Sequence, residues 1–245
     1  MMDKKNNELI KPSSAIPILL YHKIEPPAPT GTPSRSLSVH PKRFESQMRW
    51  LKAFGYQGLS ICDLMPYLEG KKAGRVFGLT FDDGYRNVLQ NAAPILGDLG
   101  FTATNYFVSG QIGGYNQWDV PRKIPKLPLM TELEMREWVD NGHEAGAHTI
   151  SHPVLADLSH EAAQQEITDC KKVIEDAAGA PVKAFCYPHG SHNTNIRTLV
   201  ENAEYTSATT TKKSHVRTGD ERFSLPRITV RRTDPGLKVL FRCLI

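Results

Sequence analysis

Several features that mark common classes of protein are missing from this 245-residue sequence. It has no run of about 18 apolar residues, which excludes a helix that crosses a membrane. Its four cysteines form no CxxC pair, which excludes a zinc ribbon and a thioredoxin-type motif. Positive charge is in slight excess, with 30 lysines and arginines against 26 aspartates and glutamates in scattered positions. An excess of that size does not indicate a protein that binds nucleic acid.

A targeting signal is also missing at the amino terminus. Residues 1–11 are polar and contain no apolar core of a signal peptide. The scattered cysteines are typical of reduced thiols in the cytosol. We therefore expect a cytoplasmic protein if the sequence stands as given, and an exported one if a leader has been removed. Residues 1–15 are predicted to form a polar tail that precedes one folded domain over residues 16–245.

The sequence does contain enough apolar material for a sizeable core, because 40% of its residues are hydrophobic and 23% are charged. Strand-like runs and helical periods alternate about seven times, with strands expected at 16–21, 75–81, 102–108, 144–148, 182–187, 205–211 and 223–230. This alternation predicts an α/β fold, in which helices cover a parallel sheet that is open or closed as a barrel. Catalytic groups in such folds gather at the carboxyl ends of the strands.

Two adjacent carboxylates follow the predicted strand 75–81. Neighbouring carboxylates repel each other unless a cation is near, and side chains at a strand end point in alternating directions. Asp82 and Asp83 can therefore play different roles, with one bound to a metal and the other free for proton transfer. The alternative is a plain Asp-Asp-Gly turn.

Two histidines lie at and just beyond the end of the predicted strand 144–148. His148 and His152 are four residues apart, so we expect them to meet on one face of a helical turn and share a metal ion. The alternative is a pair of surface histidines. His143 precedes the strand, on the other side of the sheet, and is expected to be structural.

A third polar segment follows the predicted strand 182–187, where Phe185 to Gly190 read FCYPHG. Taken alone, it is consistent with a simple turn. However, all three segments follow separate strands, and this joint placement favours a shared site. One carboxylate and two histidines make a three-ligand site with an open position, which is typical of catalytic rather than structural zinc.

The segments TFDDGY (80–85), HTISHP (148–153) and YPHG (187–190), in this order, resemble motifs of the polysaccharide deacetylase family, carbohydrate esterases with a NodB-type domain. The resemblance implies a distorted (β/α) barrel of about seven strands, with residues 16–245 as the catalytic domain. It also implies a divalent metal, usually zinc, and hydrolysis of N-acetyl groups on amino sugars. The third motif resembles the subgroup that acts on poly-N-acetylglucosamine.

The resemblance also implies roles for individual residues. Asp83, His148 and His152 match the metal ligands, and Asp82 matches the catalytic base. His189 would offer its backbone N–H to the oxyanion. The substrate-binding residues that we expect are Tyr85, Trp118, Tyr187 and Pro188.

This sequence departs from the family pattern at two places. Many relatives carry an arginine two residues before the motif proline, where Cys186 stands here, and Arg227 is our candidate for replacing it beside Asp82. The Leu-x-His motif of many relatives is missing near the carboxyl terminus. The general acid is therefore open, with three candidates: His22, His189 and His192.

Residues 109–130 have no clear period and are predicted to form a long surface loop at the mouth of the active site. Its Trp118 offers an aromatic face on which a sugar could stack. The alternative is that Trp118 packs the loop against the barrel.

Two other functions remain open at this point. One is a related amidohydrolase of a small cyclic ureide or a lipid-linked sugar. The other is a non-catalytic carbohydrate-binding relative, although the retained Asp82 argues against it because that residue has no duty in metal binding. In each case we expect a carbohydrate or small-molecule ligand, no nucleic acid and no membrane-spanning segment, and the oligomeric state stays open.

Overall fold

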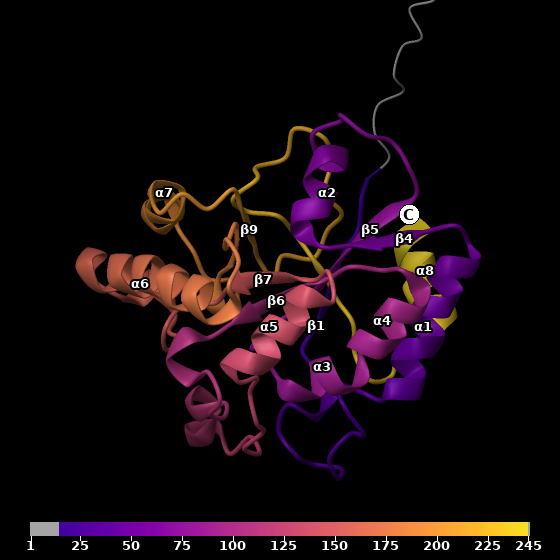
Figure 1. Ribbon diagram of the computed structural model, residues 1–245, viewed down its shortest axis with the longest axis horizontal. Coiled ribbons are helices and arrows are strands. Elements are labelled where there is room, and N and C mark those ends of the chain that lie inside the picture. Colours follow the sequence, from indigo (N-terminus) through magenta and orange to yellow (C-terminus); the bar gives the residue numbers. More distant parts are fainter. Residues whose placement is uncertain (1–14, 245) are drawn as a thin grey trace, which may run out of the picture.

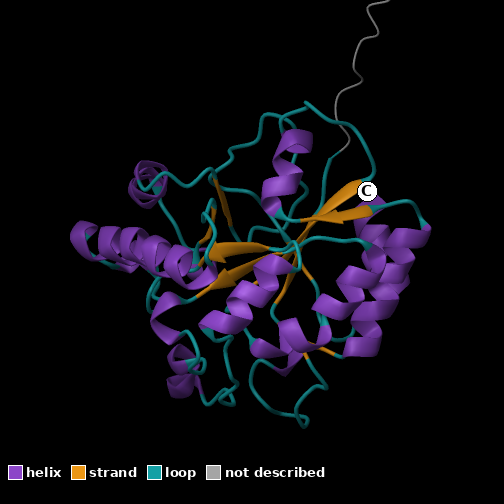
Figure 2. Ribbon diagram, viewed as in Figure 1, coloured by secondary structure: helices purple, strands orange, loops and turns teal. Residues whose placement is uncertain are grey.

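Parallel strands surrounded by helices make up the computed structural model, which describes residues 15–244 (Figure 1, Figure 2). Residues 1–14 of the predicted polar tail lie outside the described residues. None of the helices in the described part of the chain is long and apolar enough to cross a membrane.

The main sheet is entirely parallel within its named strands, in the order β10-β1-β5-β6-β7-β8-β9. Strand β4 pairs with the first half of β5, and β6 pairs with its second half. A separate small sheet pairs β2 with β3. The strand bounds are β1 Ile18–Tyr21, β2 Lys23–Ile24, β3 Ser38–Val39, β4 Gln57–Leu59, β5 Val76–Phe81, β6 Thr104–Phe107, β7 Glu144–Ala147, β8 Ala184–Cys186, β9 Ser207–Thr209 and β10 Ile228–Thr229.

The sheet curls so that the segment just before β10, at one edge, forms backbone hydrogen bonds with β9 and the residues after it at the other edge. The Leu225 N–H donates to the Ala208 carbonyl at 2.9 Å, and the Arg227 N–H donates to the Lys212 carbonyl at 2.8 Å. This arrangement confirms the prediction of a distorted (β/α) barrel. It also brings Arg227, far along the chain, to the same end of the sheet as the motif residues.

Helices cover the outside of the sheet, with α6 and α7 on one side of Figure 1 and α1, α4 and α8 on the other. The helix bounds are α1 Pro41–Ala53, α2 Ile61–Leu68, α3 Arg86–Asn91, α4 Ala93–Leu99, α5 Glu132–Asp140, α6 His160–Ala178, α7 Thr194–Asn202 and α8 Gly236–Leu244. Local sequence explains several of their ends. Thr131 and Glu134 form a reciprocal capping box at the start of α5, and Gly179 ends α6 in the left-handed conformation.

The central strand β5 is buried at all six positions, as expected for a parallel strand covered on both faces. Its last residue, Phe81, contacts Tyr21 and Phe44, with ring centroids 5.7 and 5.8 Å away. Phe81 also meets Trp138 edge to face at 6.1 Å. The two aspartates that follow β5 therefore begin at a rigidly packed point of the core.

Proline shortens one expected strand. The run expected at 223–230 is a strand only at Ile228–Thr229. Because Pro226 has no N–H to donate to a sheet, the residues around it bridge the edges without forming a regular strand.

Candidate active site

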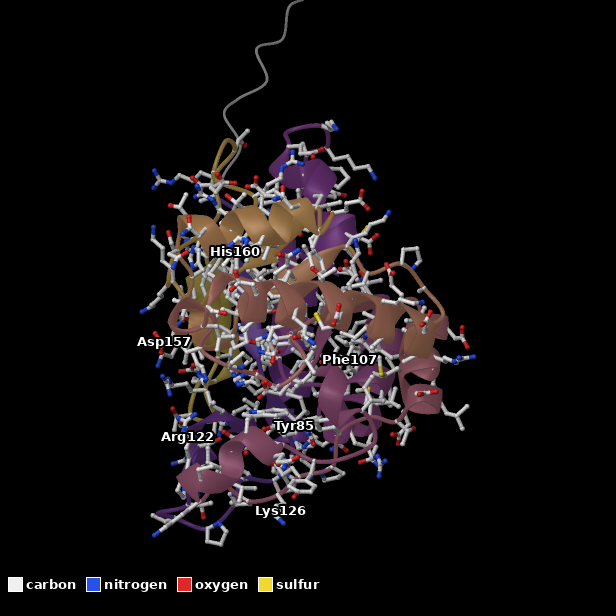
Figure 3. All side chains as sticks on the ribbon, turned by 90° about the vertical axis from the view of Figure 1, so that its left-hand side faces the viewer. Tyr85, Phe107, Arg122, Lys126, Asp157 and His160 are labelled. Atoms are coloured by element: carbon white, nitrogen blue, oxygen red, sulfur yellow. The ribbon has the colours of Figure 1, made fainter. Side chains whose placement is uncertain are left out.

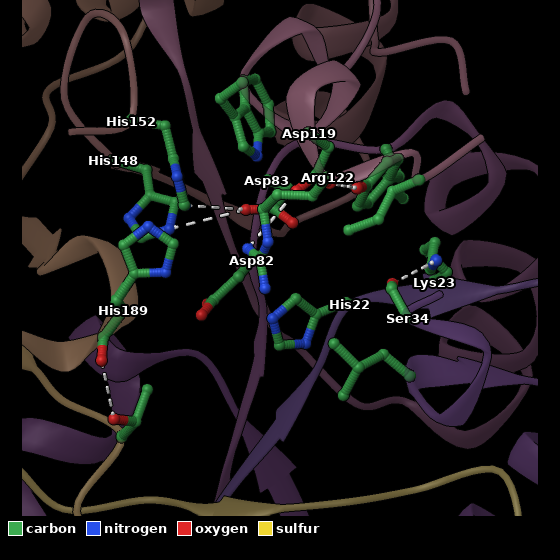
Figure 4. A pocket seen from close by; sticks show the side chains of 15 residues that line it. His22, Lys23, Ser34, Asp82, Asp83, Asp119, Arg122, His148, His152 and His189 are labelled. Atoms are coloured by element: carbon green, nitrogen blue, oxygen red, sulfur yellow. Dashed lines mark hydrogen bonds and ion pairs between the residues drawn. The ribbon is translucent and has the colours of Figure 1, made fainter. Parts of the chain in front are cut away.

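The motif residues extend the parallel sheet by one hydrogen bond each. The Asp82 N–H donates to the Tyr21 carbonyl at 3.0 Å, and the His148 N–H donates to the Phe107 carbonyl at 2.9 Å. These bonds fix the backbone where each strand ends. The side chains that follow meet around one cavity (Figure 4). The shared site predicted from the sequence is therefore present.

Asp83, His148 and His152 present three potential metal-binding atoms within 4.8 Å of one another, and all three residues are buried. The Asp83 Oδ1 lies 3.6 Å from the His148 Nε2 and 3.5 Å from the His152 Nε2. Ligand atoms that bind a tetrahedral zinc ion at about 2.0–2.1 Å lie roughly 3.4 Å apart. The spacing of these donors fits a single divalent ion.

The hydrogen bonding of His148 supports the same assignment. Its Nδ1 lies 2.7 Å from the carbonyl oxygen of Cys186. Because a carbonyl only accepts, Nδ1 must carry the proton, and the lone pair of Nε2 is left facing Asp83. A ligand histidine in a metal site is typically oriented by such a bond from its other ring nitrogen.

The segment that carries the two histidines is not helical, so the helical turn expected at His148–His152 is wrong. Thr149 and His152 have positive φ angles of 67° and 62°, which break a helical turn. The loop is fixed instead by the Thr149 Oγ1, which accepts a hydrogen bond from the His152 N–H at 3.0 Å. The two rings still meet, with centroids 4.8 Å apart.

Backbone strain concentrates at this site. Asp83 and His189 also have positive φ angles, of 80° and 58°. Such conformations cost about 1–3 kcal/mol each for residues other than glycine, and they persist where the surrounding structure enforces them.

Glu166 of α6 holds the loop between the two histidines. Its carboxylate accepts hydrogen bonds from the Ile150 N–H at 2.7 Å, the Ser151 N–H at 3.0 Å and the Ser151 hydroxyl at 2.5 Å. On the other side of the loop, the Gly110 N–H donates to the Ile150 carbonyl at 2.9 Å. A Cβ atom at Gly110 would lie 2.6 Å from that same oxygen, so glycine permits the close approach. Sequence reasoning missed Glu166 because no local pattern links it to the loop.

Asp82 binds Arg227. It also lies close enough to His148 and Cys186 to form a second group of potential metal-binding atoms, but Arg227 occupies both of its carboxylate oxygens. The guanidinium donates from Nη1 to Oδ1 at 2.7 Å and from Nη2 to Oδ2 at 2.8 Å. It also donates to the Thr80 hydroxyl at 3.0 Å and the Thr210 carbonyl at 2.9 Å. Arg227 therefore occupies the place beside Asp82 for which the sequence made it the candidate.

Cys186 packs against the same pair, because the Arg227 Nη2 lies 3.1 Å from its sulfur. Burial raises the pKa of the Cys186 thiol well above its ordinary value, so the sulfur stays protonated. Cys186 thus fills space beside the ion pair and adds no charge to it.

The two aspartates differ in electrostatics. Burial by itself would raise the pKa of Asp82, but Arg227 outweighs burial and holds that pKa well below its usual range. Asp83 has no arginine or lysine partner among residues 15–244, and burial raises its pKa to about 7. A divalent ion beside Asp83 would stabilise its charged form.

His22 directly follows β1 and lines the cavity, whereas His192 does not. The His22 Nδ1 is buried without a hydrogen-bond partner among the described residues. Burial lowers the pKa of His22 to about 4. His192 instead stacks on Tyr187 with centroids 4.5 Å apart and lies 3.1 Å from the Ser224 hydroxyl. His189 lines the cavity and packs edge to face on His152 at 4.7 Å.

The residues expected to bind substrate divide into two groups. Trp118 and Tyr85 line the cavity, and Trp118 stacks on His152 with ring centroids 4.9 Å apart. Tyr187 and Pro188 are buried and are not part of the cavity wall. The Tyr187 hydroxyl donates to the Phe223 carbonyl at 3.0 Å, which suits a supporting position behind the site.

The loop 109–130 borders the cavity, as predicted, and contains two short 3₁₀ helices at Ser109–Gln111 and Gln117–Arg122. Figure 3 shows Arg122 and Lys126 of this loop at one end of the molecule. The cavity also contains Lys23, which sequence reasoning overlooked even though it follows His22 directly.

Comparison with known proteins agrees with this geometry. The family model described as polysaccharide deacetylase matches residues 69–208. The chain is 30% identical over 224 residues to YxkH of Bacillus subtilis, which is named as a polysaccharide deacetylase, and the match covers 91% of this chain and 72% of that protein. The chain therefore belongs to the polysaccharide deacetylase family, and the predicted class of enzyme, a carbohydrate deacetylase, is confirmed.

Two further similar proteins are a relative whose name gives its substrate and a relative with a solved structure. A poly-β-1,6-N-acetyl-D-glucosamine N-deacetylase of Staphylococcus epidermidis is 24% identical over 242 residues, which cover 93% of this chain and 83% of that protein. The deacetylase PplD of Streptococcus pyogenes, solved in complex with acetate, is 26% identical. Its structure matches with a TM-score of 0.82 and covers 94% of this chain and 99% of that chain.

Proposed function

We propose that this protein is a metal-dependent N-deacetylase that removes acetyl groups from an N-acetylated amino-sugar polymer or oligosaccharide. One observation carries the proposal. The three metal-binding groups of Asp83, His148 and His152 share a cavity with Asp82, a separate carboxylate that Arg227 keeps ionised. The named substrate of the staphylococcal relative, an N-acetylglucosamine polymer, supports an amino-sugar substrate.

We propose zinc as the metal, held by Asp83 and the Nε2 atoms of His148 and His152. Two imidazoles and one carboxylate suit zinc and leave a position open. When bound, the ion supplies Lewis acidity that polarises the amide carbonyl and makes water more acidic.

The remaining chemistry belongs to the protein. Asp82 accepts the proton of the attacking water, and the bidentate contact with Arg227 fixes its carboxylate for that transfer. The backbone N–H of His189, in its left-handed conformation, donates to the developing oxyanion. Removing one oxyanion donor typically costs roughly 10²–10³ in rate.

We propose His22 as the group that returns a proton to the leaving amine. It lies on the cavity wall with Asp82, and its Nδ1 has no competing partner in the described part of the chain. With a pKa of about 4, its ring is neutral near pH 7. His22 must therefore gain a proton before it can donate one. The proton that Asp82 takes from the attacking water passes to His22 and then to the leaving amine, and the charge of Asp82 favours the protonated form of His22.

The non-catalytic alternative is not favoured by the site, because Asp82 is held in place by a fully buried arginine although it has no role in binding the ion. No observation favours a cyclic ureide or a lipid-linked sugar as substrate. The expectation of a cytoplasmic or exported location stays a prediction.

The test is release of free amine from chitotetraose and from a β-1,6-linked N-acetylglucosamine oligomer by the zinc-loaded protein. We expect Asp82→Asn to abolish turnover and keep zinc in elemental analysis. His22→Gln should lower kcat by about 10²-fold or more, with zinc and KM nearly unchanged. Failure of the zinc-loaded wild type to release amine from either glycan would contradict the proposed function. Full activity of His22→Gln would contradict only the role of His22.

A further inference from the structure

One charged side chain on the cavity wall has no role in the mechanism above. Lys23 begins β2 directly after His22, and Figure 4 shows it with Ser34 on the opposite side of Asp83 from His148 and His152. A sugar whose acetamido group reaches the metal-binding residues would extend from there toward other parts of the wall. Lys23 and Ser34 are therefore placed to contact a substituent of the sugar rather than the reacting amide.

The ammonium group of Lys23 is buried and makes no direct ion pair within the described part of the chain, although its Nζ lies 5.9 Å from the centroid of the Tyr85 ring. The residue is only 3% exposed, and its Nζ donates to the Ser34 hydroxyl at 2.9 Å. Among the described residues, no carboxylate oxygen lies within 4.0 Å of this Nζ. An ammonium has three N–H donors, so donors remain beyond the one that binds Ser34. Burying an unpaired charge is strongly unfavourable, which indicates that an external group completes this site.

Three carboxylates, those of Glu25, Asp83 and Asp119, lie near enough to act on the charge of Lys23, and each is engaged by other groups. The Glu25 carboxylate accepts hydrogen bonds from the Ser38 hydroxyl at 2.9 Å and from the Asn87 side-chain amide at 3.1 Å. The Asp119 Oδ2 accepts from the Asn116 amide at 3.1 Å, and its Oδ1 lies 3.7 Å from Arg122. Asp83 faces the two histidines. Each is therefore held away from Lys23 by a partner of its own.

The charge of the cavity also favours an anion. The cations Lys23 and Arg122, with Arg227 behind the wall, face four carboxylates, those of Asp82, Asp83 and Asp119 and of Glu25 beside Lys23. A divalent ion on the metal-binding residues would leave the loaded cavity positive.

We propose that Lys23 and Ser34 form a subsite for an anionic substituent, a carboxylate or a phosphate, on the amino-sugar substrate. This inference rests on the proposed deacetylase function and names a substrate class within it. A charge-assisted hydrogen bond to a desolvated ammonium is among the stronger polar contacts in proteins. The subsite would therefore distinguish acidic glycans from neutral ones of the same length.

The experiment measures binding rather than turnover. Isothermal titration calorimetry is performed on the zinc-loaded Asp82→Asn protein with three tetrasaccharides: neutral chitotetraose, its 6-O-phosphorylated form, and a form with lactyl ether carboxylates at O3. We expect at least one anionic glycan to bind about tenfold or more tightly than the neutral one. Preference for the phosphate or for the carboxylate would identify the source of the anion.

Variants assign that preference to Lys23. In the same background, Lys23→Met should reduce the ratio of neutral to anionic Kd to near one, and Lys23→Arg should restore most of it. Lys172→Met removes an exposed lysine whose side chain is 79% exposed and should leave the ratio unchanged. If the Lys23→Met protein melts at a much lower temperature, the Ser34→Ala variant is measured instead, and it should reduce the ratio of neutral to anionic Kd several-fold.

Three results would overturn the inference. The first is equal affinity of the parent protein for all three glycans. The second is a Kd ratio that Lys23→Met leaves unchanged. The third is a tenfold loss of affinity for acetate alone in Lys23→Met, because the lysine would then bind the released product. The proposed function fails separately, if the zinc-loaded wild type releases no amine from any glycan.

Discussion

Replacing Arg227 by methionine is expected to destabilise the protein and nearly abolish catalysis. Arg227 is 0% exposed and donates two hydrogen bonds to Asp82, with further bonds to Thr80 and Thr210. Removing one partner of a buried ion pair leaves the other charge uncompensated and typically costs about 3–5 kcal/mol. We expect the free energy of unfolding to fall by about that amount at pH 7.

The loss of unfolding free energy in the Arg227→Met variant should depend on pH, and the direction of that dependence follows from the pKa of Asp82. Its folded pKa is depressed, so its contribution in the wild type is fully present above the unfolded pKa of about 3.9 and is lost as pH falls further. Without Arg227, the remaining large influence is burial, which raises the Asp82 pKa and favours the protonated form. The variant therefore loses less stability on acidification, and the gap to wild type should narrow as pH falls through the raised Asp82 pKa of the variant and on through about pH 4.

Urea unfolding at pH 7 and at about pH 3.5 measures this gap, with amine release at pH 7 as the catalytic readout. Arg222→Met is the matched control, because its side chain is 52% exposed and lies 3.6 Å from Glu69. It should change stability by less than about 1 kcal/mol. The reasoning is refuted if Arg227→Met unfolds within about 1 kcal/mol of wild type at pH 7, or if the gap is the same at both pH values.

Three further changes test the metal-binding residues and the neighbouring wall. Asp83→Asn should reduce zinc affinity, measured by competition with a chelating dye, and unchanged affinity would show that this carboxylate is not a ligand. Glu166→Gln should weaken Co²⁺ binding about tenfold and alter the visible Co²⁺ spectrum, because its loop positions His152, whereas exposed Asp169→Asn on the same helix should do neither. Trp118→Ala should raise KM for an oligosaccharide and spare a small acetylated ester; equal losses on both, or a large drop in melting temperature, would make Trp118 structural.

Signals that act within a few residues of the sequence predicted the ends of helices and strands well. The capping box of Thr131 and Glu134 starts a helix as expected, and β5 ends directly before Asp82. The prediction failed at His148–His152, where four-residue spacing suggested a helical turn. Spacing alone does not reveal a positive φ, which depends on contacts from distant residues such as Glu166.

The sequence by itself determined that residues of its three motifs meet at one site. Parallel strands of similar length end at one level, so residues that follow them must come together, and Asp82, Asp83, His148 and His152 do so. The alternation of strands and motifs along the chain is enough to predict this meeting, because it requires only that each motif directly follows a strand of the same parallel sheet.

Only the tertiary structure decided the partners that control these residues. Arg227 lies 145 positions from Asp82 along the chain and reaches it because the segment before β10 bridges the edges of the curled sheet. Lys23 became notable only when its burial and lack of a carboxylate partner could be measured. Burial, charge pairing and the choice among the three histidine candidates for the general acid depend on packing between distant segments. No local pattern in the sequence encodes that packing.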